Sequence, residues 1–208
     1  MSVSFHKDES YGVHKGQNVS KYTISNSTGL TLVVIEYGAT IISCQAPDKN
    51  GVSEEVTLNY STLEDVANKA RYFGCSVGRY ANRINGGKFS IDGESYQLNT
   101  NNNGINHLHG GNIGFDKQVW SSRIVRHAEE SGVEFTLVSP DGDENYPGTL
   151  EVSVTYLVNH SCNTLTFNFA AKVLDKPTIV NLTNHSYCKS IALLSYLILY
   201  TFLREFEW

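Results

Sequence analysis

The stretch GVEFTLVSPDGDENYPGTLEVSVTYLVNHSCNTLTFNFAA, residues 132–171, decides the fold class of this chain. It contains three runs in which apolar and polar residues alternate, at 132–138, 150–158 and 165–171. Alternation with a period of two places every second side chain on one face of a strand, so each run is typical of a half-buried strand. Turn-forming residues separate the runs. We therefore predict three consecutive β-strands here.

The same pattern continues outward from this stretch toward the N-terminus. A short mixed run predicts a strand at 22–25, and runs rich in β-branched residues predict strands at 30–37 and 39–44. Asp92, Gly93 and Glu94 separate two further runs within 88–98, which is typical of a tight hairpin. Only 62–69 is predicted to form a short helix. The sequence shows no long amphipathic helix and no interdomain linker, so we expect an all-β sandwich or barrel.

The composition excludes several function classes. The chain has 208 residues, 18% of them charged and 40% hydrophobic, which is ordinary for a globular protein. Its net charge is -5 and its 16 Lys and Arg residues are scattered, which argues against a nucleic-acid partner. The apolar run IALLSYLILYTFL (191–203) is shorter than the about 18 residues of a membrane-spanning helix, so no membrane partner is expected.

Cysteine usage and the N-terminus point to a cell compartment. The cysteines Cys44, Cys75, Cys162 and Cys188 form no C-x-x-C pair, so the usual zinc and redox spacings are missing. The opening residues MSVSFHKDES lack the apolar core of a signal peptide. We therefore expect reduced thiols and a cytoplasmic location.

Three polar clusters are candidates for chemistry, and the first is GRYANRI (78–84). Its two arginines and one amide can hydrogen-bond several hydroxyls at once, because a guanidinium is a fixed fork of donors. Alternatively, one of the arginines pairs with a carboxylate and only holds a loop.

The second and third clusters, NHLHGG (106–111) and NLTNHSY (181–187), carry histidines. On a strand, His107 and His109 would share a face and could be two metal ligands, but no third ligand lies at a convincing spacing, so we expect no metal. A plain loop histidine is the alternative. His185 suits general acid or base catalysis, although a lone histidine is often structural.

Four stretches taken together carry a resemblance to a known family. They are GRYANRINGGKFSIDGESYQL (78–98), NHLHGGNIGFDKQVW (106–120), SPDGDENYPGTLEVSVTY (139–156) and PTIVNLTNHSY (177–187). In order and spacing they resemble the aldose 1-epimerases, also called galactose mutarotases. The resemblance covers roughly residues 20–187.

The resemblance implies a large antiparallel twisted β-sandwich, a supersandwich, that binds free hexoses such as galactose or glucose in a cleft. It implies exchange of the α and β anomers of the sugar, with no cofactor and no metal. Asn82 and Arg83 would bind substrate, His109 would lie beside the ring oxygen, His185 would be the general acid and Tyr187 would lie close to the sugar.

The chemistry accounts for these residue types. The C1 hydroxyl must lose a proton while the ring oxygen gains one, so a base and an acid are needed on opposite sides of the sugar. The resemblance implies that the base is a glutamate beyond the HSY motif. After Tyr187 this chain departs from the family pattern, and its remaining acids, Glu205 and Glu207, lie in no recognisable motif.

We therefore expect a partial family domain at 1–187 and a divergent apolar tail at 188–208, as in a truncated product. A sandwich incomplete at its C-terminus would expose strand edges and apolar faces, so we expect poor solubility or a need for a partner. The oligomeric state stays open. A non-catalytic sugar-binding module and an inactive fragment lacking the glutamate base are the alternatives to an active epimerase.

Overall fold

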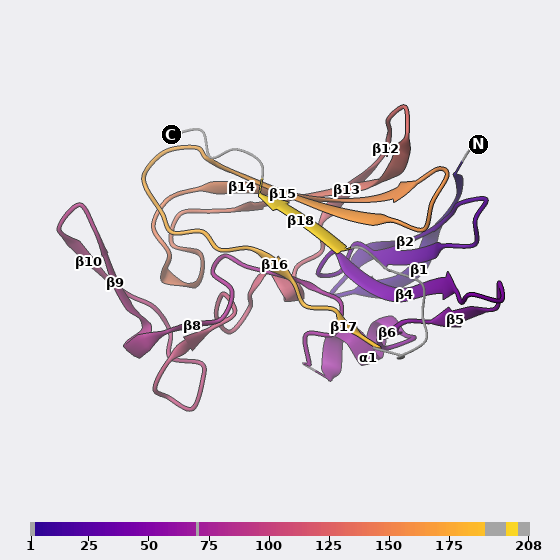
Figure 1. Ribbon diagram of the computed structural model, residues 1–208. Helices are drawn as coiled ribbons and strands as arrows, with labels where there is room; N and C mark the ends of the chain where they lie inside the picture. The colour runs from indigo at the N-terminus through magenta and orange to yellow at the C-terminus, as the bar shows by residue number, and fades with distance from the viewer. Residues whose placement is uncertain (1–2, 70, 190–198, 204–208) are drawn as a thin grey trace.

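The computed structural model describes residues 3–69, 71–189 and 199–203, and it contains two large β-sheets (Figure 1). The first sheet runs in chain order through β1 (Ser4–His14), β2 (Gln17–Ser25), β3 (Thr31–Ile35), β4 (Thr40–Pro47) and β5 (Ser53–Glu55). The second contains β12 (Ser121–Arg126), β13 (Glu130–Ser139), β14 (Leu150–Asn159), β15 (Leu165–Val173) and β18 (Leu199–Leu203). The prediction of an all-β sandwich is confirmed.

Shorter elements accompany the two large sheets, most of them along the chain between β5 and β12. They are β6 (Thr57–Leu58), α1 (Leu63–Asn68), β7 (Ser76–Val77), β8 (Arg83–Ile84), β9 (Lys88–Ile91), β10 (Glu94–Gln97), β11 (His107–Leu108), β16 (Thr183–Asn184) and β17 (Tyr187–Cys188), together with the 3-10 turns Asn85–Gly87, Phe115–Lys117 and Asp143–Asn145. Strands β8 and β11, β7 and β16, and β6 and β17 form three small antiparallel pairs. These pairs bring distant parts of the chain together. Among the helices in the described residues, none has the length and hydrophobicity needed to cross a membrane.

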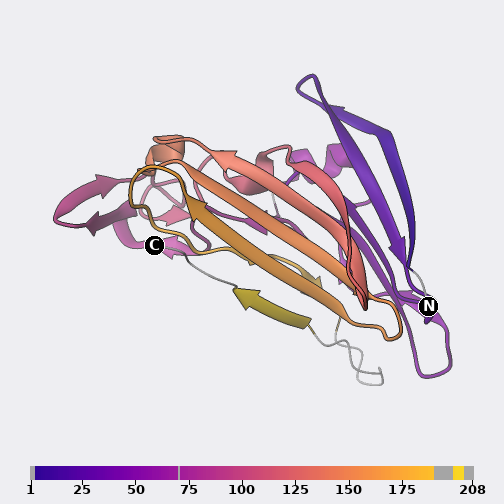
Figure 2. The same cartoon turned by 90° about the horizontal axis from the view of Figure 1, so that it is seen from above.

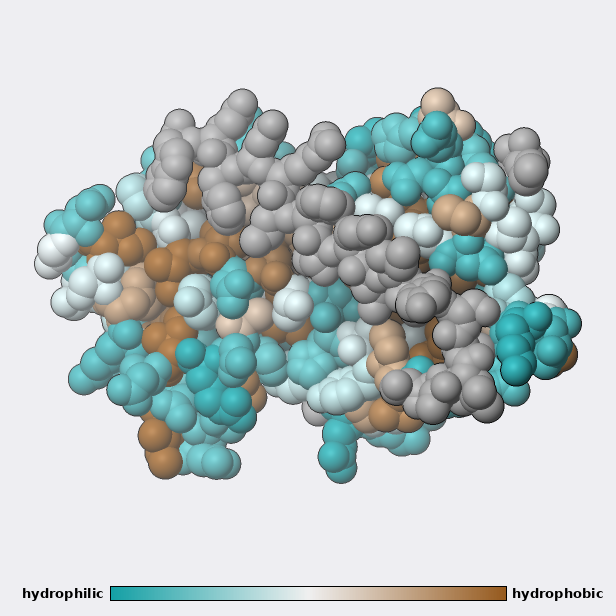
Figure 3. Space-filling model, viewed as in Figure 1, coloured by the Kyte–Doolittle hydropathy of each residue, from teal (hydrophilic) through white to brown (hydrophobic). Residues whose placement is uncertain are grey.

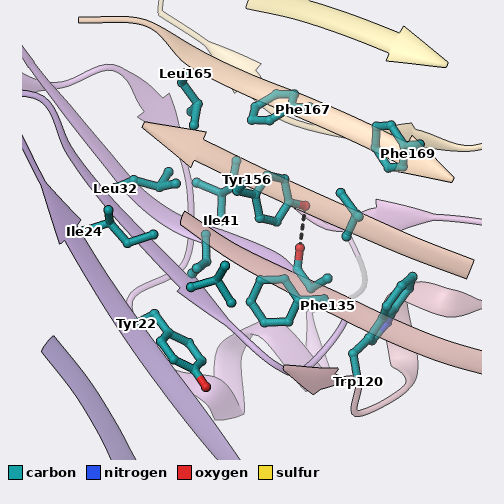
Figure 4. Close-up of a cluster of buried hydrophobic side chains, with 14 of the residues drawn as sticks. Tyr22, Ile24, Leu32, Ile41, Trp120, Phe135, Tyr156, Leu165, Phe167 and Phe169 are labelled. Carbon is teal, nitrogen blue, oxygen red and sulfur yellow. Dashed lines mark hydrogen bonds between the residues drawn. The ribbon is translucent and has the colours of Figure 1, made fainter. Parts of the chain in front are cut away.

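The core lies between the two large sheets, and the alternation seen in the sequence builds it. Phe135 of β13, Tyr156 of β14 and Phe167 of β15 point toward Tyr22 and Ile24 of β2 (Figure 4). Phe135, Tyr156 and Ile24 are fully buried. Because apolar burial is the main driving force of folding, this shared layer holds the two sheets together.

The predicted strands and hairpin are confirmed, with boundaries moved by a few residues. The three runs of 132–171 form β13, β14 and β15, which pair antiparallel in that order. The hairpin within 88–98 is β9 and β10, with Glu94 opposite Ile91. The short helix predicted at 62–69 is α1, which the Thr62 side chain caps by accepting from the Asp65 backbone N–H.

Four strands of the two large sheets lie outside the predicted pattern, namely β1, β5, β12 and β18. Strand β1 is polar along most of its length and breaks its register with β2 between Asp8 and Gly12, and β12 is short and largely polar. Strand β18 pairs parallel with β15, the one parallel pair among the described strands, and covers its edge from Leu165 to Phe169 (Figure 2). Of the tail predicted at 188–208, residues 190–198 and 204–208, with Glu205 and Glu207, lie outside the described residues.

Candidate functional site

The candidate site is assembled where three loop segments meet beside the small strand pairs. The Ala81 N–H donates to the Asn181 carbonyl at 2.7 Å, and the His185 N–H donates to the Cys75 carbonyl at 2.8 Å. The His109 N–H donates to the Asn82 carbonyl at 3.1 Å. Backbone hydrogen bonds therefore fix the relative positions of all three polar clusters found in the sequence.

An open pocket of about 300 Å³ lies at this junction, at the lower end of the size range of small-molecule sites. Apart from Ala81, its lining is polar and aromatic: Asn82, His109, Thr183, Asn184, His185, Ser186 and Tyr187. Four of the five residues predicted to act on a ligand therefore line one pocket. The fifth, Arg83, lies directly beside it.

The two predicted catalytic histidines lie against each other. The ring centroids of His109 and His185 are 5.2 Å apart and the rings meet edge to face. Tyr187 continues the row, with its ring centroid 5.1 Å from that of His185. Two imidazoles at this distance can both reach one small ligand in the pocket.

Tyr72 forms the wall behind both histidines and was not predicted. Its ring centroid lies 4.7 Å from that of His109 and 5.7 Å from that of His185. The Lys117 ammonium lies 5.4 Å from the centre of the Tyr72 ring. No sequence signal marked Tyr72, because its role depends on contacts with residues far along the chain.

His109 is held as a neutral imidazole with a defined tautomer. The Asn82 backbone N–H donates to Nδ1 at 3.0 Å, so the proton of the neutral ring resides on Nε2. Burial lowers the pKa of His109 to about 4, with help from the nearby positive charges of His185, Arg83 and Lys117. His109 therefore offers the pocket an N–H donor rather than a cation.

Arg83 is oriented by two side-chain amides. Its Nε–H donates to Asn102 Oδ1 at 3.0 Å, and Nη1–H donates to Asn82 Oδ1 at 3.3 Å. Asn82 adopts a left-handed backbone conformation with φ of 65°, which asparagine tolerates better than most residues. The guanidinium keeps further N–H groups for a ligand at the rim of the pocket.

The second arginine of the first cluster has a structural role. Arg79 is 1% exposed and donates through Nη1 and Nη2 to a group of carbonyl and hydroxyl oxygens: those of Ser139, Pro140, Pro147, Gly148 and Thr178. The alternative that one arginine only holds a loop is therefore correct for Arg79. Its partners are carbonyls and hydroxyls rather than a carboxylate.

His107 is also structural. Its Nδ1–H donates to the Asn99 carbonyl at 2.8 Å, and the Tyr146 hydroxyl donates to Nε2 at 2.6 Å. Both ring nitrogens are therefore occupied, and the ring is fully buried while His109 lines the pocket. The two histidines do not form a pair of metal ligands, and the described residues contain no group of three or more His, Cys, Asp or Glu arranged to hold a metal.

Known proteins are similar to this chain over the region that contains the pocket residues. The family model described as aldose 1-epimerase matches residues 20–190. The chain is 43% identical over 169 residues to galactose mutarotase from Sus scrofa, covering 81% of this chain and 47% of the relative. It is 38% identical over 172 residues to aldose 1-epimerase from Escherichia coli K12, covering 83% and 48%. The chain spans about half the length of the curated relatives it matches.

Solved structures show the same fold. The crystal structure of galactose 1-epimerase from Lactobacillus acidophilus superimposes with a TM-score of 0.80 at 32% identity, covering 90% of this chain and 53% of that protein. An aldose epimerase homologue from C. elegans gives a TM-score of 0.71 at 31% identity, covering 90% and 51%. With the family model matching residues 20–190, the chain belongs to the aldose 1-epimerase family.

Proposed function

We propose that the pocket binds a free hexose such as galactose or glucose, and that the protein exchanges the α and β anomers of this sugar by opening and closing its ring. One observation carries the proposal: His109 and His185 meet edge to face at 5.2 Å inside a pocket that Asn82 and Tyr187 also line. Family membership supports the same reaction.

Each residue has a chemical task in this proposal. Protonated His185 donates its proton to the ring oxygen as the C1–O5 bond breaks, while a base removes the proton of the C1 hydroxyl. The resulting aldehyde rotates about the C1–C2 bond, and the reverse proton transfers close the ring on the other face. His109 donates from Nε2–H to a sugar oxygen, and Asn82 and Arg83 hold the hydroxyls, so orientation contributes to the rate.

The base is the remaining requirement. Within the described residues, no carboxylate lines the pocket. The family resemblance assigns this task to a glutamate that follows the HSY motif. Loss of a general base typically slows a reaction by about 10²- to 10⁴-fold. This observation favours a second candidate function, a module that binds the sugar without turning it over quickly.

Polarimetry separates the two candidates. The optical rotation of freshly dissolved α-galactose is followed with and without protein, and galactose binding is measured by calorimetry on the same samples. An epimerase accelerates the change in rotation, and His185→Ala removes the acceleration. A binding module shows saturable binding without acceleration. The matched control is His127→Ala, since His127 is exposed and outside the pocket.

A cytoplasmic location is part of the proposal. All four cysteines are free, and burial raises the pKa of the Cys44 thiol to about 12 and raises that of Cys75 as well. Such thiols stay protonated and unreactive at neutral pH, which suits a reducing compartment. Cell fractionation of the untagged protein tests this location.

A further inference from the structure

The segment SPDGDENYPG (139–148) has no task in the proposed function, although it contacts the chain on both sides of His109. It lies between β13 and β14 and contains the turn Asp143–Asn145. Arg79 holds both of its ends, because this buried guanidinium donates to the carbonyls of Ser139 and Gly148. The segment is therefore anchored to the core independently of the pocket.

The His109 loop needs such support because its backbone is unusual. His109, Gly110 and Gly111 all adopt positive φ angles, of 52°, 82° and 110°. A non-glycine residue in this region is unfavourable by about 1 kcal/mol or more, so surrounding contacts must hold it. A Cβ added to Gly110 would collide with the Gly78 carbonyl oxygen, so the loop is pressed against the backbone beneath it.

Glu144 supplies the contacts on the outer side of this loop. Its Oε2 accepts from the Asn112 backbone N–H at 2.8 Å, and its Oε1 accepts from the Ile113 backbone N–H at 2.8 Å. The Asn99 amide donates to Oε2 at 3.2 Å. A Cβ added to Gly111 would collide with Oε2, so the carboxylate lies directly on the loop.

The same segment holds the chain on the other side of His109. Two residues after Glu144, the Tyr146 hydroxyl donates to His107 Nε2 at 2.6 Å. His109 thus lies between two points held by the segment that Arg79 anchors, with His107 before it and Asn112 and Ile113 after it. Hydrogen bonds to an ionised group are about twice as strong as neutral ones, so the Glu144 contacts hold the loop more strongly than the Tyr146–His107 hydrogen bond does.

We propose that Glu144 is a positioning residue, whose carboxylate holds the His109 imidazole in the pocket by fixing the backbone of residues 112 and 113. Its effect on sugar binding rests on the proposed function, whereas its effect on the His109 ring does not. A glutamine in its place offers one acceptor and turns an amide N–H toward a backbone N–H, so one of the two contacts is lost.

The test is the titration of His109 followed by ¹⁵N NMR in the whole chain. In Glu144→Gln we expect the pKa of His109 to rise by about one unit, because a released loop exposes the ring to water. Loss of the negative charge alone would lower this pKa, so a rise reports movement of the ring. Glu144→Asp retains a carboxylate and should shift the pKa less.

Glu151→Gln is the matched control, since Glu151 is an exposed residue of β14 outside the pocket, and it should leave His109 unchanged. An unchanged or lowered His109 pKa in folded Glu144→Gln overturns the proposal. If thermal melting shows that Glu144→Gln does not fold, Glu144→Asp decides by the direction of its shift: its shorter side chain cannot keep both backbone contacts, so a small rise of the His109 pKa supports the proposal and no rise overturns it.

Galactose titrations of the same variants separate this proposal from the proposed function. If both hold, Glu144→Gln weakens galactose binding by about tenfold, the usual effect of losing one charge-assisted hydrogen bond. If the unchanged protein binds no galactose but His109 still shifts in Glu144→Gln, the sugar function fails and the positioning role stands. If the unchanged protein binds galactose but His109 does not shift in the variant, the positioning role fails and the sugar function stands.

Discussion

At the scale of single residues, the environment of His109 links the site to the stability of the fold. Burial and neighbouring positive charges lower its pKa from 6.5 in an ordinary setting to about 4 in the folded protein. Between these values the unfolded chain binds more protons than the folded one at this residue. The free energy of unfolding must therefore fall as the pH falls through this range.

We predict that the pH dependence of stability between pH 7 and pH 4 becomes shallower in His109→Gln. The contribution of His109 is about 1–2 kcal/mol over this range, because solvent screens the partly exposed ring. Urea unfolding at pH 7 and pH 4 measures it. Equal pH slopes for the two proteins would contradict the lowered pKa.

Loss of the Arg79 side chain should destabilise the fold severely. Removal of the guanidinium leaves several buried carbonyls without donors, including those of Pro147 and Gly148. We predict that Arg79→Met lowers the free energy of unfolding by about 3–5 kcal/mol. Arg123→Met, at an exposed ion pair with Glu134, should change it by less than about 1 kcal/mol. Urea unfolding of both variants provides the comparison.

Only those residues of the candidate site that stand in short sequence motifs could be predicted from the sequence. Asn82, His109, His185 and Tyr187 stand in short motifs whose residue types match the chemistry, and they meet at one pocket. Tyr72 lies outside these motifs, and Glu144 lies in the resembling stretch 139–156, where the sequence assigned it no role. Their importance comes from rings and backbone groups that other segments bring to them, which a single sequence does not show.

At the scale of elements, the turn at Gly110 requires both a positive φ angle and the absence of a Cβ, and mutation can separate these two requirements. Gly110 has positive φ and no room for a Cβ, whereas Gly104 has a φ of 68° and no atom within 4 Å of the position that an added Cβ would take. The two glycines therefore form a matched pair.

We predict that Gly104→Ala lowers the free energy of unfolding by about 1 kcal/mol, the backbone cost alone. Gly110→Ala should cost about 3 kcal/mol or more and weaken galactose binding, because the Gly78 carbonyl must move. Equal losses in the two variants, measured by urea unfolding, would refute the close approach at Gly110.

Strands could be predicted where one buried face makes apolar and polar residues alternate along the sequence. In β14 the side chains of Leu150, Val152, Val154 and Tyr156 alternate with polar ones and enter the core. In β1 both faces are largely polar, so no alternation marks it. It is held by its long pairing with β2, and Phe5 and Tyr11 add packing against the buried clusters.

At the scale of the whole molecule, the two large sheets share one core cluster. Phe135 lies at its centre, with its ring centroid 6.2 Å from that of Tyr22 in the first sheet and 5.9 Å from that of Tyr156 in its own. Neither sheet can lose this layer without exposing the other. We therefore expect both sheets to unfold together.

We predict that Phe135→Ala lowers the free energy of unfolding by about 3–5 kcal/mol. Near-ultraviolet circular dichroism, which reports aromatic packing, should change at the same urea concentration as the far-ultraviolet signal of the strands. The control Val138→Ala, at an exposed position of the same strand, should cost less than about 0.5 kcal/mol. Separate transitions would show that the sheets are independent.

The surface of the protein exposes hydrophobic side chains, as the sequence predicted. Hydrophobic residues gather in patches between hydrophilic ones on the face shown in Figure 3. Leu174, Leu58 and Tyr187 are each about half exposed. The sequence predicted exposed apolar faces but not the sheet order or the parallel pairing of β18 with β15, because pairing between distant strands leaves no local trace.

The backbone pairing between the Gly74 and His185 regions has a consequence for biosynthesis. The Gly74 backbone N–H donates to the His185 carbonyl at 3.1 Å, and the Asn184 side-chain amide donates to the Gly74 carbonyl across a separation of 110 residues. During translation, Asn82 and Arg83 leave the ribosome long before His185 does. The pocket can therefore form only after nearly the whole matched domain has been made, and a nascent chain halted earlier would carry Asn82 and His109 without the residues that complete the pocket.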